Sequence, residues 1–407
     1  MSHKERLRIQ IEDLIKEKKI TFPELLYENK IQNWWFDDDE IKKANSEDKL
    51  LTLDLDVGTS CHYNCCFCFA STHRKEEGIE KKVSRIKEVI DEAAGMGLKT
   101  IKIVGAGEPT LFPKLLEIVI YAYEKHKVRC VIFTTGDIFG NDELVSNVYK
   151  GERIDSGIDL AKEFYKLGAS IVVKYMTLNR KKEMEFCGID EQTLINKDKG
   201  LLNLIKVGFN KENPTRLGVD FLLLKGIKNS DGKIIEGNYK EAVEAFAFFN
   251  QFNIFMVLNT SMDCGLTLLS GENTKDKKRQ VIVLSEKEAQ KVAEDLYLYA
   301  KKNKIPFDER ISPYFLSPVC SQLNHGLYVT DDMRIKSCPG QPLTKMELDR
   351  GIRESAIGRY EKEGDLIEAW RNNPYKHMCI GHKCPSRSGK TYFKNFEERI
   401  KKKLYKK

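Results

Sequence analysis

Strand-like and helix-like segments alternate between residues 51 and 260, and this alternation constrains the fold more than any other feature of the chain. Short apolar runs are followed by longer runs in which apolar residues recur three and four positions apart. Strands that are apolar on both faces are typical of parallel sheets covered by helices. The expected strands are 51–57, 100–104, 129–134, 170–175, 216–224 and 254–259, and the expected helices between them are 82–96, 113–126, 158–167, 191–207 and 239–252.

Right-handed crossovers would curl this α/β sheet into a partial (β/α)6 barrel. Ser285 and Glu288 have the spacing of a capping box, which predicts a further helix ending near Asn303. Beyond that helix the helical period disappears, and Pro, Gly, Ser and Cys become frequent. The expected segments are 1–50, a helical N-terminal segment; 51–310, the barrel; 311–390, a smaller cysteine-rich domain; and 391–407, a basic helix with one apolar face.

The composition excludes several classes of protein. The chain has 407 residues, of which 41% are hydrophobic, and its formal net charge is only +7. So small a charge on so long a chain favours no polyanionic partner, and nucleic acid is disfavoured. No apolar stretch approaches a membrane span, so no membrane partner is expected, and the N-terminus does not resemble a signal peptide. We therefore expect a cytoplasmic protein whose eleven cysteines are reduced.

Four of these cysteines lie in one short loop after the first expected strand. Cys61, Cys65 and Cys68 have the spacing C-x3-C-x2-C, and Cys66 lies between them. Three thiolates at the carboxyl edge of a parallel sheet can bind three irons of a cubane cluster and leave the fourth iron open to a reactant. A closed zinc site is the alternative, with Cys66 or His62 as its fourth ligand.

With an aromatic residue before its last cysteine, this loop resembles the signature of the radical S-adenosylmethionine (SAM) enzymes. The segment from Gly105 to Pro109 is similar to the GGEP element of that family, and the segment from Thr134 to Gly136 is similar to its TNG-type strand ending. In the family, the glutamate and the glycine backbone position the methionine amine of SAM. The resemblance implies a cofactor site that includes Phe67, Gly105, Ala106, Gly107, Glu108 and Thr134.

Two weaker candidates for SAM contacts lie at the ends of later strands. Lys174 ends the fourth expected strand and Asn259 the sixth, and either could contact the carboxylate, ribose or adenine of SAM. Polar residues also cap strands for structural reasons, so the alternative is a structural role.

The resemblance also implies a reaction. In the family, the open iron binds the amino and carboxylate groups of SAM, and an electron from the cluster breaks a sulfur–carbon bond. The resulting 5′-deoxyadenosyl radical abstracts a hydrogen atom from the substrate. The implied protein is a radical SAM oxidoreductase with SAM and a 4Fe–4S cluster as cofactors and a flavodoxin- or ferredoxin-type electron donor.

A second set of cysteines lies beyond the expected barrel: Cys320, Cys338, Cys379 and Cys384. Four thiolates suit a closed zinc site or a second cluster, and spacing alone does not separate these. The segment resembles the C-terminal extension of the SPASM and twitch subfamily, in which auxiliary clusters are bound. A set of four implies a twitch-like domain with one auxiliary 4Fe–4S cluster suited to electron transfer. Met333 stands where the subfamily usually has glycine, so the hairpin there could differ in shape.

Four further cysteines lie outside both ligand sets. Cys130 lies in an apolar strand and is expected in the core, and Cys66 is expected to point away from the cluster if the loop follows the family. Cys187 and Cys264 follow strands and could face the cavity as hydrogen-atom donors, although a structural role is favoured for both.

The sequence leaves the substrate open. The segment 1–50 looks short for the leader-recognition module of peptide-modifying relatives, which favours a small molecule such as a sugar, an aminocyclitol or a nucleoside. The aromatic and acidic patch from Trp34 to Glu40 could instead bind a peptide or form a packing corner. From another class, a zinc-bearing nucleic-acid-binding protein would also account for the cysteines and the lysine-rich tail.

Overall fold

One large sheet organises the described part of the protein. The computed structural model describes residues 1–18, 29–34, 36–68, 79–105, 107–229, 232–260, 279–306, 322–340 and 356–377. The strand order of the sheet is β12 (Gly358–Arg359), β11 (Arg334–Lys336), β10 (Gly326–Val329), β1 (Thr52–Leu55), β2 (Thr100–Ile103), β3 (Arg129–Thr134), β4 (Ser170–Lys174), β5 (Leu217–Leu223) and β8 (Phe255–Thr260). From β10 to β8 every neighbouring pair is parallel. The expected parallel sheet is therefore confirmed.

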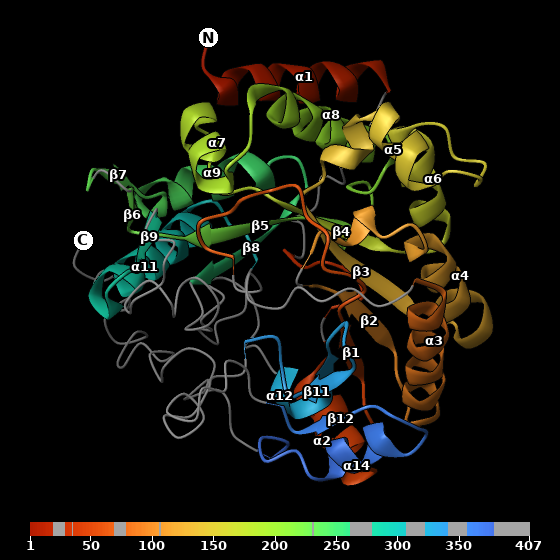
Figure 1. Ribbon diagram of the computed structural model, residues 1–407. Helices are drawn as coiled ribbons and strands as arrows, with labels where there is room; N and C mark the ends of the chain where they lie inside the picture. Colours follow the sequence, from red (N-terminus) through yellow and green to blue (C-terminus); the bar gives the residue numbers. More distant parts are fainter. Residues whose placement is uncertain are drawn as a thin grey trace.

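Helices follow the strands and cover one face of the sheet (Figure 1). Apolar side chains of β1, such as Leu53 and Leu55, share a buried core with residues of these helices. The helices are α1 (His3–Glu17), α2 (Asp38–Ser46), α3 (Ile79–Gly95), α4 (Leu115–His126), α5 (Asp142–Val148), α6 (Gly157–Lys166), α7 (Arg180–Cys187), α8 (Glu191–Val207), α9 (Ala242–Asn250), α11 (Glu286–Lys302), α12 (Gln322–His325) and α14 (Asp365–Arg371). Among these, α5, α7, α12 and α14 were not expected from the sequence. In the described residues, no helix is long and apolar enough to cross a membrane.

The N-terminal segment packs against the inner face of the sheet. Ile31 belongs to an apolar cluster with Val172 of β4 and Phe255 of β8. The ring of Trp34 lies against that of Phe133 in β3, with 5.2 Å between the ring centroids. The described aromatic residues of the patch between residues 34 and 40 therefore pack against the rest of the protein. Trp35 lies outside the described residues.

The inner face of β1 and β2 is polar. Asp54 and Lys102 are register partners on these strands, and both are buried. Burial raises the pKa of Asp54 to about 6, although the nearby Lys102 works against this shift. The Lys102 ammonium donates to the Gln322 side-chain oxygen of α12 at 2.8 Å. The segment before β10 is thus joined to the inside of the sheet by polar side chains.

The hairpin of β10 and β11 belongs to the same sheet as the expected barrel. β10 pairs in parallel with β1 along the whole of that strand, from Thr52 with Gly326 to Leu55 with Val329. Met333 in the hairpin turn has a φ of 66° and is fully buried. A non-glycine residue in this left-handed region costs roughly 1 to 2 kcal/mol. The turn therefore has the backbone conformation that glycine favours, although glycine is missing there.

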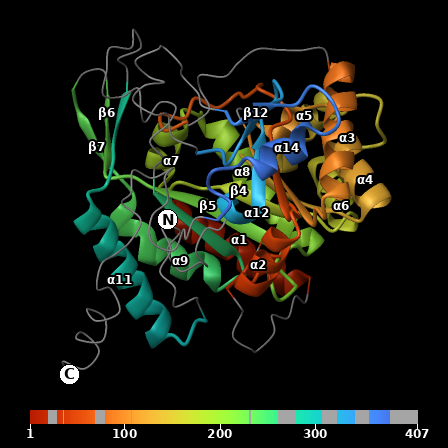
Figure 2. The same ribbon diagram turned by 90° about the horizontal axis from the view of Figure 1, so that it is seen from below.

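A smaller sheet lies at the side of the molecule away from α3 and α4 (Figures 1 and 2). Its strand order is β7 (Ile234–Glu236), β6 (Gly226–Asn229) and β9 (Arg279–Ile282). α11 follows β9, and its capping box between Ser285 and Glu288 is confirmed.

Candidate functional site

Residues 56–68, here called the cysteine loop, leave β1 at the carboxyl edge of the sheet. Their backbone is attached to the C-terminal end of α7. The Asn64 N–H donates to the Cys187 carbonyl at 3.1 Å, and the Cys66 N–H donates to the Phe186 carbonyl at 3.2 Å. Two hydrogen bonds to one helix end give the loop a defined position before any ligand is bound.

The thiols of the cysteine loop fall into two groups. Cys61, Cys65 and Cys68 are partly exposed, whereas Cys66 is buried. The Cys66 thiol donates to the Phe186 carbonyl at 3.4 Å. The prediction that Cys66 points away from the other three is consistent with this contact, and three thiols remain at the surface of the loop.

The geometry of the cysteine loop disfavours a zinc ion. Cys66 is directed to α7, and His62 Nε2 lies 2.7 Å from a carboxylate oxygen of Asp137. Burial opposes protonation of His62, but the Asp137 carboxylate outweighs this effect and raises the histidine pKa. In the described ranges, no group of three or more His, Cys, Asp or Glu side chains is close enough to hold a single metal ion. Three thiolates that bind three different irons fit this loop better than a closed zinc site.

The glycine-rich segment after β2 packs directly against the cysteine loop. The Glu108 N–H donates to the Ser60 carbonyl at 2.8 Å. A Cβ added to Gly107 would lie 2.6 Å from that carbonyl oxygen, and one added to Gly105 would lie 2.4 Å from a carboxylate oxygen of the loop. Ala106 lies outside the described residues. The glycines are therefore required for close approach of the two segments.

We expect Gly107→Ala to reduce the iron bound per chain after anaerobic reconstitution. The new Cβ would overlap backbone atoms of the cysteine loop, where no flexible side chain can move aside. Overpacking of this kind costs about 1 to 3 kcal/mol. Gly95→Ala is the matched control, because a Cβ at Gly95 meets nothing within 4 Å. Iron analysis and thermal unfolding of both variants would check this. Equal iron content in the two variants would contradict it.

Glu108 joins the glycine-rich segment to the end of β3. Its Oε1 accepts hydrogen bonds from the Thr110 N–H at 3.0 Å, the Thr110 hydroxyl at 2.6 Å and the Thr134 hydroxyl at 2.7 Å. Its Oε2 accepts one from the Thr135 N–H at 2.6 Å. Burial raises the pKa of Glu108, and these hydrogen bonds oppose the rise. The structure thus brings together Glu108 and Thr134, which the sequence assigned to one site.

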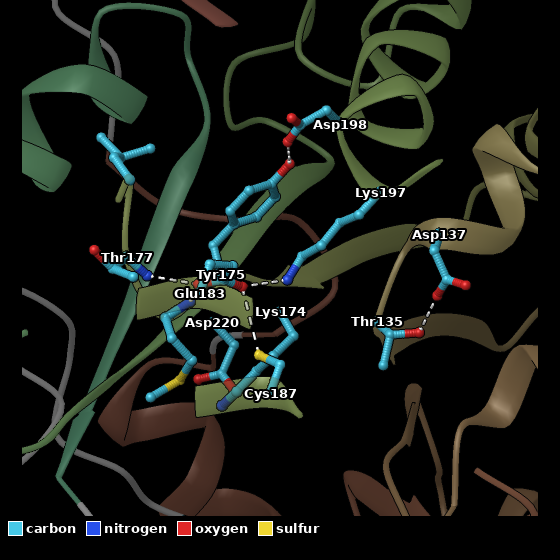
Figure 3. A network of polar contacts seen from close by, with 12 residues as sticks. Thr135, Asp137, Lys174, Tyr175, Thr177, Glu183, Cys187, Lys197, Asp198 and Asp220 are labelled. Carbon is cyan, nitrogen blue, oxygen red and sulfur yellow. Dashed lines mark hydrogen bonds and ion pairs between the residues drawn. The ribbon is translucent and has the colours of Figure 1, made fainter. Parts of the chain in front are cut away.

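The ends of β4, β5 and β8 carry a second polar group. The Lys174 ammonium lies 2.6 Å from Asp220 Oδ2, and the Asn259 amide donates to Asp220 Oδ1 at 2.8 Å (Figure 3 shows Lys174 and Asp220). Lys174 also lies 4.9 Å from the centre of the Phe67 ring in the cysteine loop. Sequence reasoning placed Lys174, Asn259 and Phe67 at the site but missed Asp220. The sequence feature that could have revealed Asp220 is the presence of one carboxylate in the apolar strand β5.

Of the second cysteine set, only Cys338 lies within the described residues. It follows β11, is 8% exposed and packs with Leu323 and Tyr375. Its predicted partners, which lie outside the described residues, are Cys320, Cys379 and Cys384. The auxiliary site remains a prediction.

The remaining cysteines are buried where they are described. Cys130 is in the core, and burial raises the pKa of its thiol to about 12. Cys187 is fully buried at the end of α7 and does not lie in an open loop. Hydrogen bonding to Cys65, together with burial, raises the pKa of Cys187 well above its ordinary value. Cys264 lies outside the described residues.

Comparison with known families matches the part of the chain that carries the cysteine loop, the glycine-rich segment and the end of β3. The family model of the Radical SAM superfamily matches residues 55–173. The mycofactocin maturases MftC of Mycobacterium ulcerans and of Mycobacterium tuberculosis are each 28% identical to this chain over 113 residues. That segment is 28% of this chain and 30% of the M. ulcerans protein. The match therefore covers under a third of these relatives.

Solved structures support the fold over more of the chain. The structure of SuiB from Streptococcus suis bound to the precursor peptide SuiA has a TM-score of 0.50 at 16% identity, and the match covers 83% of this chain and 68% of SuiB. The structure of anSMEcpe with bound AdoMet and the Cp18Cys peptide has a TM-score of 0.51 at 16% identity, covering 81% of this chain and 82% of that one. At such identities the likeness concerns the fold.

Proposed function

We propose that this chain is a radical SAM enzyme, that Cys61, Cys65 and Cys68 hold its 4Fe–4S cluster, and that it modifies a peptide. The match of the Radical SAM family model to residues 55–173 supports the first of these assignments. The observation that carries the cluster assignment is the direct contact between the sequence elements assigned to the cofactor site. The cysteine loop, the glycine-rich segment and the end of β3 are joined through Ser60, Glu108 and Thr134.

The chain supplies binding groups on both sides of the cysteine loop. Glu108 Oε2, which accepts one hydrogen bond, has capacity left for the ammonium of the methionine part of SAM. Lys174 and Asn259, held by Asp220, offer a cation and an amide for the carboxylate and the ribose or adenine. When bound, the cofactors supply an electron and a carbon radical that removes a hydrogen atom from the substrate, and the residues named here orient them.

We assign the second cysteine set to an auxiliary 4Fe–4S cluster. Cys338 is buried beside apolar residues next to the hairpin that extends the sheet from β1. A cluster there would be attached to the same sheet as the cysteine loop. Four thiolates would leave no iron open, which suits electron transfer with a flavodoxin- or ferredoxin-type donor or with a substrate radical.

Support for a substrate class comes from the similar proteins more than from the sequence. The sequence favoured a small molecule, mainly because the segment before the first strand looked short. Among the similar proteins, SuiB has been seen with a precursor peptide and anSMEcpe with the Cp18Cys peptide. These relatives support the alternative, a peptide-modifying enzyme. A sugar, aminocyclitol or nucleoside substrate becomes the second candidate.

The substrate proposal is tested by turnover with two panels. The reconstituted full chain would be incubated anaerobically with SAM and dithionite, with either a pooled library of synthetic peptides or a panel of sugars, aminocyclitols and nucleosides. We expect the peptides to increase 5′-deoxyadenosine formation and at least one peptide to change in mass. Stimulation by small molecules alone would overturn the peptide assignment and leave the cluster assignment standing.

A further inference from the structure

A buried ion pair lies behind the cysteine loop, between α7 and α8. Lys197 Nζ is 2.5 Å from Glu183 Oε1, and both side chains are completely buried (Figure 3). Desolvation makes buried charges costly, and a pair of this kind is weak support for stability alone. Its position next to a cofactor site therefore calls for a functional explanation.

Both charges are fixed by further contacts. Glu183 Oε2 accepts the backbone N–H groups of Met176 and Thr177, each at 2.9 Å. Lys197 Nζ lies 4.5 Å from the centre of the Tyr175 ring. Burial disfavours the ammonium, but the adjacent Glu183 carboxylate outweighs this effect and raises the pKa of Lys197. The lysine is therefore held as a cation by its ion pair with Glu183.

The pair is connected to a predicted iron ligand. The Cys187 thiol lies 3.5 Å from Glu183 Oε1, and Cys187 belongs to the buried cluster against which Cys65 packs. Lys197 also lies 5.9 Å from the ring centre of Tyr63, which stands between two of the predicted ligands. A chain of contacts thus runs from the buried cation through Glu183 and Cys187 to the sulfur of Cys65.

We propose that Lys197, held by Glu183, is a positioning residue that sets the reduction potential of the cluster bound by the cysteine loop. This inference rests on the proposed function. Reduction adds a negative charge to the cluster, and a nearby buried cation favours the reduced state because charges interact strongly in a low dielectric. The carboxylate of Glu183 acts with the opposite sign and offsets part of this effect, so the potential depends on both charges.

The test compares one single variant with the double variant. Lys197→Met removes the cation and leaves the Glu183 carboxylate with its two backbone donors. We expect about a tenfold less favourable reduction, which is about 59 mV for one electron. Adding Glu183→Gln removes the opposing charge, and the potential should return towards the wild-type value. The potentials are measured by anaerobic redox titration, using the electron paramagnetic resonance signal that changes when SAM is added.

The control is Arg216→Met, which removes a buried cation at the amino end of β5, the opposite edge of the sheet. Arg216 is 5% exposed and is paired with Glu212. We expect the potential of this variant to match the wild type. If Lys197→Met assembles no cluster, the double variant and Glu183→Gln alone carry the comparison.

The outcomes separate this proposal from the function it rests on. A wild-type protein without a SAM-responsive cluster signal would overturn the proposed function itself. A normal cluster whose potential is the same in all variants would overturn only the role of Lys197. The role of Lys197 is also overturned if the potential of the double variant differs from that of the wild type by at least as much as the potential of Lys197→Met does. Loss of the cluster in all three variants would overturn it too. A purely structural ion pair gives those results.

Discussion

The variant with Cys61→Ala, Cys65→Ala and Cys68→Ala should retain about four of the about eight irons that two cubane clusters bring to each chain. These three thiols are partly exposed on one loop that α7 and the glycine-rich segment fix in place. Their removal takes away the thiolates of the first cluster and leaves the second cysteine set unchanged. Iron, zinc and sulfide analysis after anaerobic reconstitution measures this directly.

Cys66→Ala is the matched control for the triple variant. Its thiol is buried against the Phe186 carbonyl, so we expect full iron content and a loss of stability of about 1 kcal/mol. If the wild-type protein binds only about four irons and the triple variant binds none, the assignment of the first cluster stands and that of the auxiliary cluster is wrong. Zinc in both the wild-type protein and the triple variant would contradict the account.

Two substitutions at Glu108 should separate its structural role from its role in cofactor binding. Glu108→Ala leaves four donors, three of them buried, without their acceptor, which costs about 3 to 5 kcal/mol and lowers the melting temperature by roughly 4 to 6 °C. Glu108→Gln keeps one side-chain oxygen but places an amide where the ammonium of SAM would bind. We therefore expect Glu108→Gln to weaken SAM binding about tenfold or more, with a smaller loss of stability.

Calorimetry of SAM binding to the reconstituted proteins would measure this effect beside thermal unfolding. Glu117→Gln is the control, because Glu117 is a surface residue of α4 paired with Lys87. Equal SAM affinity in Glu108→Gln and Glu117→Gln would remove Glu108 from the cofactor site and leave it as a structural carboxylate.

The sheet was predictable because its strands and helices each carry a local periodic signal. The six expected strands occur as β1, β2, β3, β4, β5 and β8, and the prediction of the helix at 191–207 matches α8. The capping box at Ser285 was predictable for the same reason, since both partners lie in one turn. Such signals require no knowledge of distant residues.

Contacts between distant segments were not predictable. Nothing local pairs β10 with β1, which lies far earlier in the chain. Asp220 was missed because a single carboxylate in an apolar strand reads as a minor irregularity until Lys174 and Asn259 are seen beside it. Lys197 and Glu183 lie on two helices and read as surface charges, although the fold buries both completely.

The candidate site was predictable in part, for a physical reason. Motif residues after successive parallel strands meet at one edge of the sheet, so Glu108 and Thr134 could be placed together from their positions alone. Cys187 was expected near a strand end, where it could face the cavity, although a structural role was favoured. The structure shows that α7 intervenes and turns this thiol towards Glu183 and Cys65.

The central claim is that the cysteine loop supports reductive cleavage of SAM, and formation of 5′-deoxyadenosine tests it most directly. The reconstituted wild-type chain, the Cys66→Ala variant and the triple variant would be incubated anaerobically with SAM and dithionite. We predict 5′-deoxyadenosine from the wild-type protein and from Cys66→Ala, and none above background from the triple variant. Absence of 5′-deoxyadenosine from an iron-loaded wild-type protein, or equal amounts from the triple variant, would contradict the account.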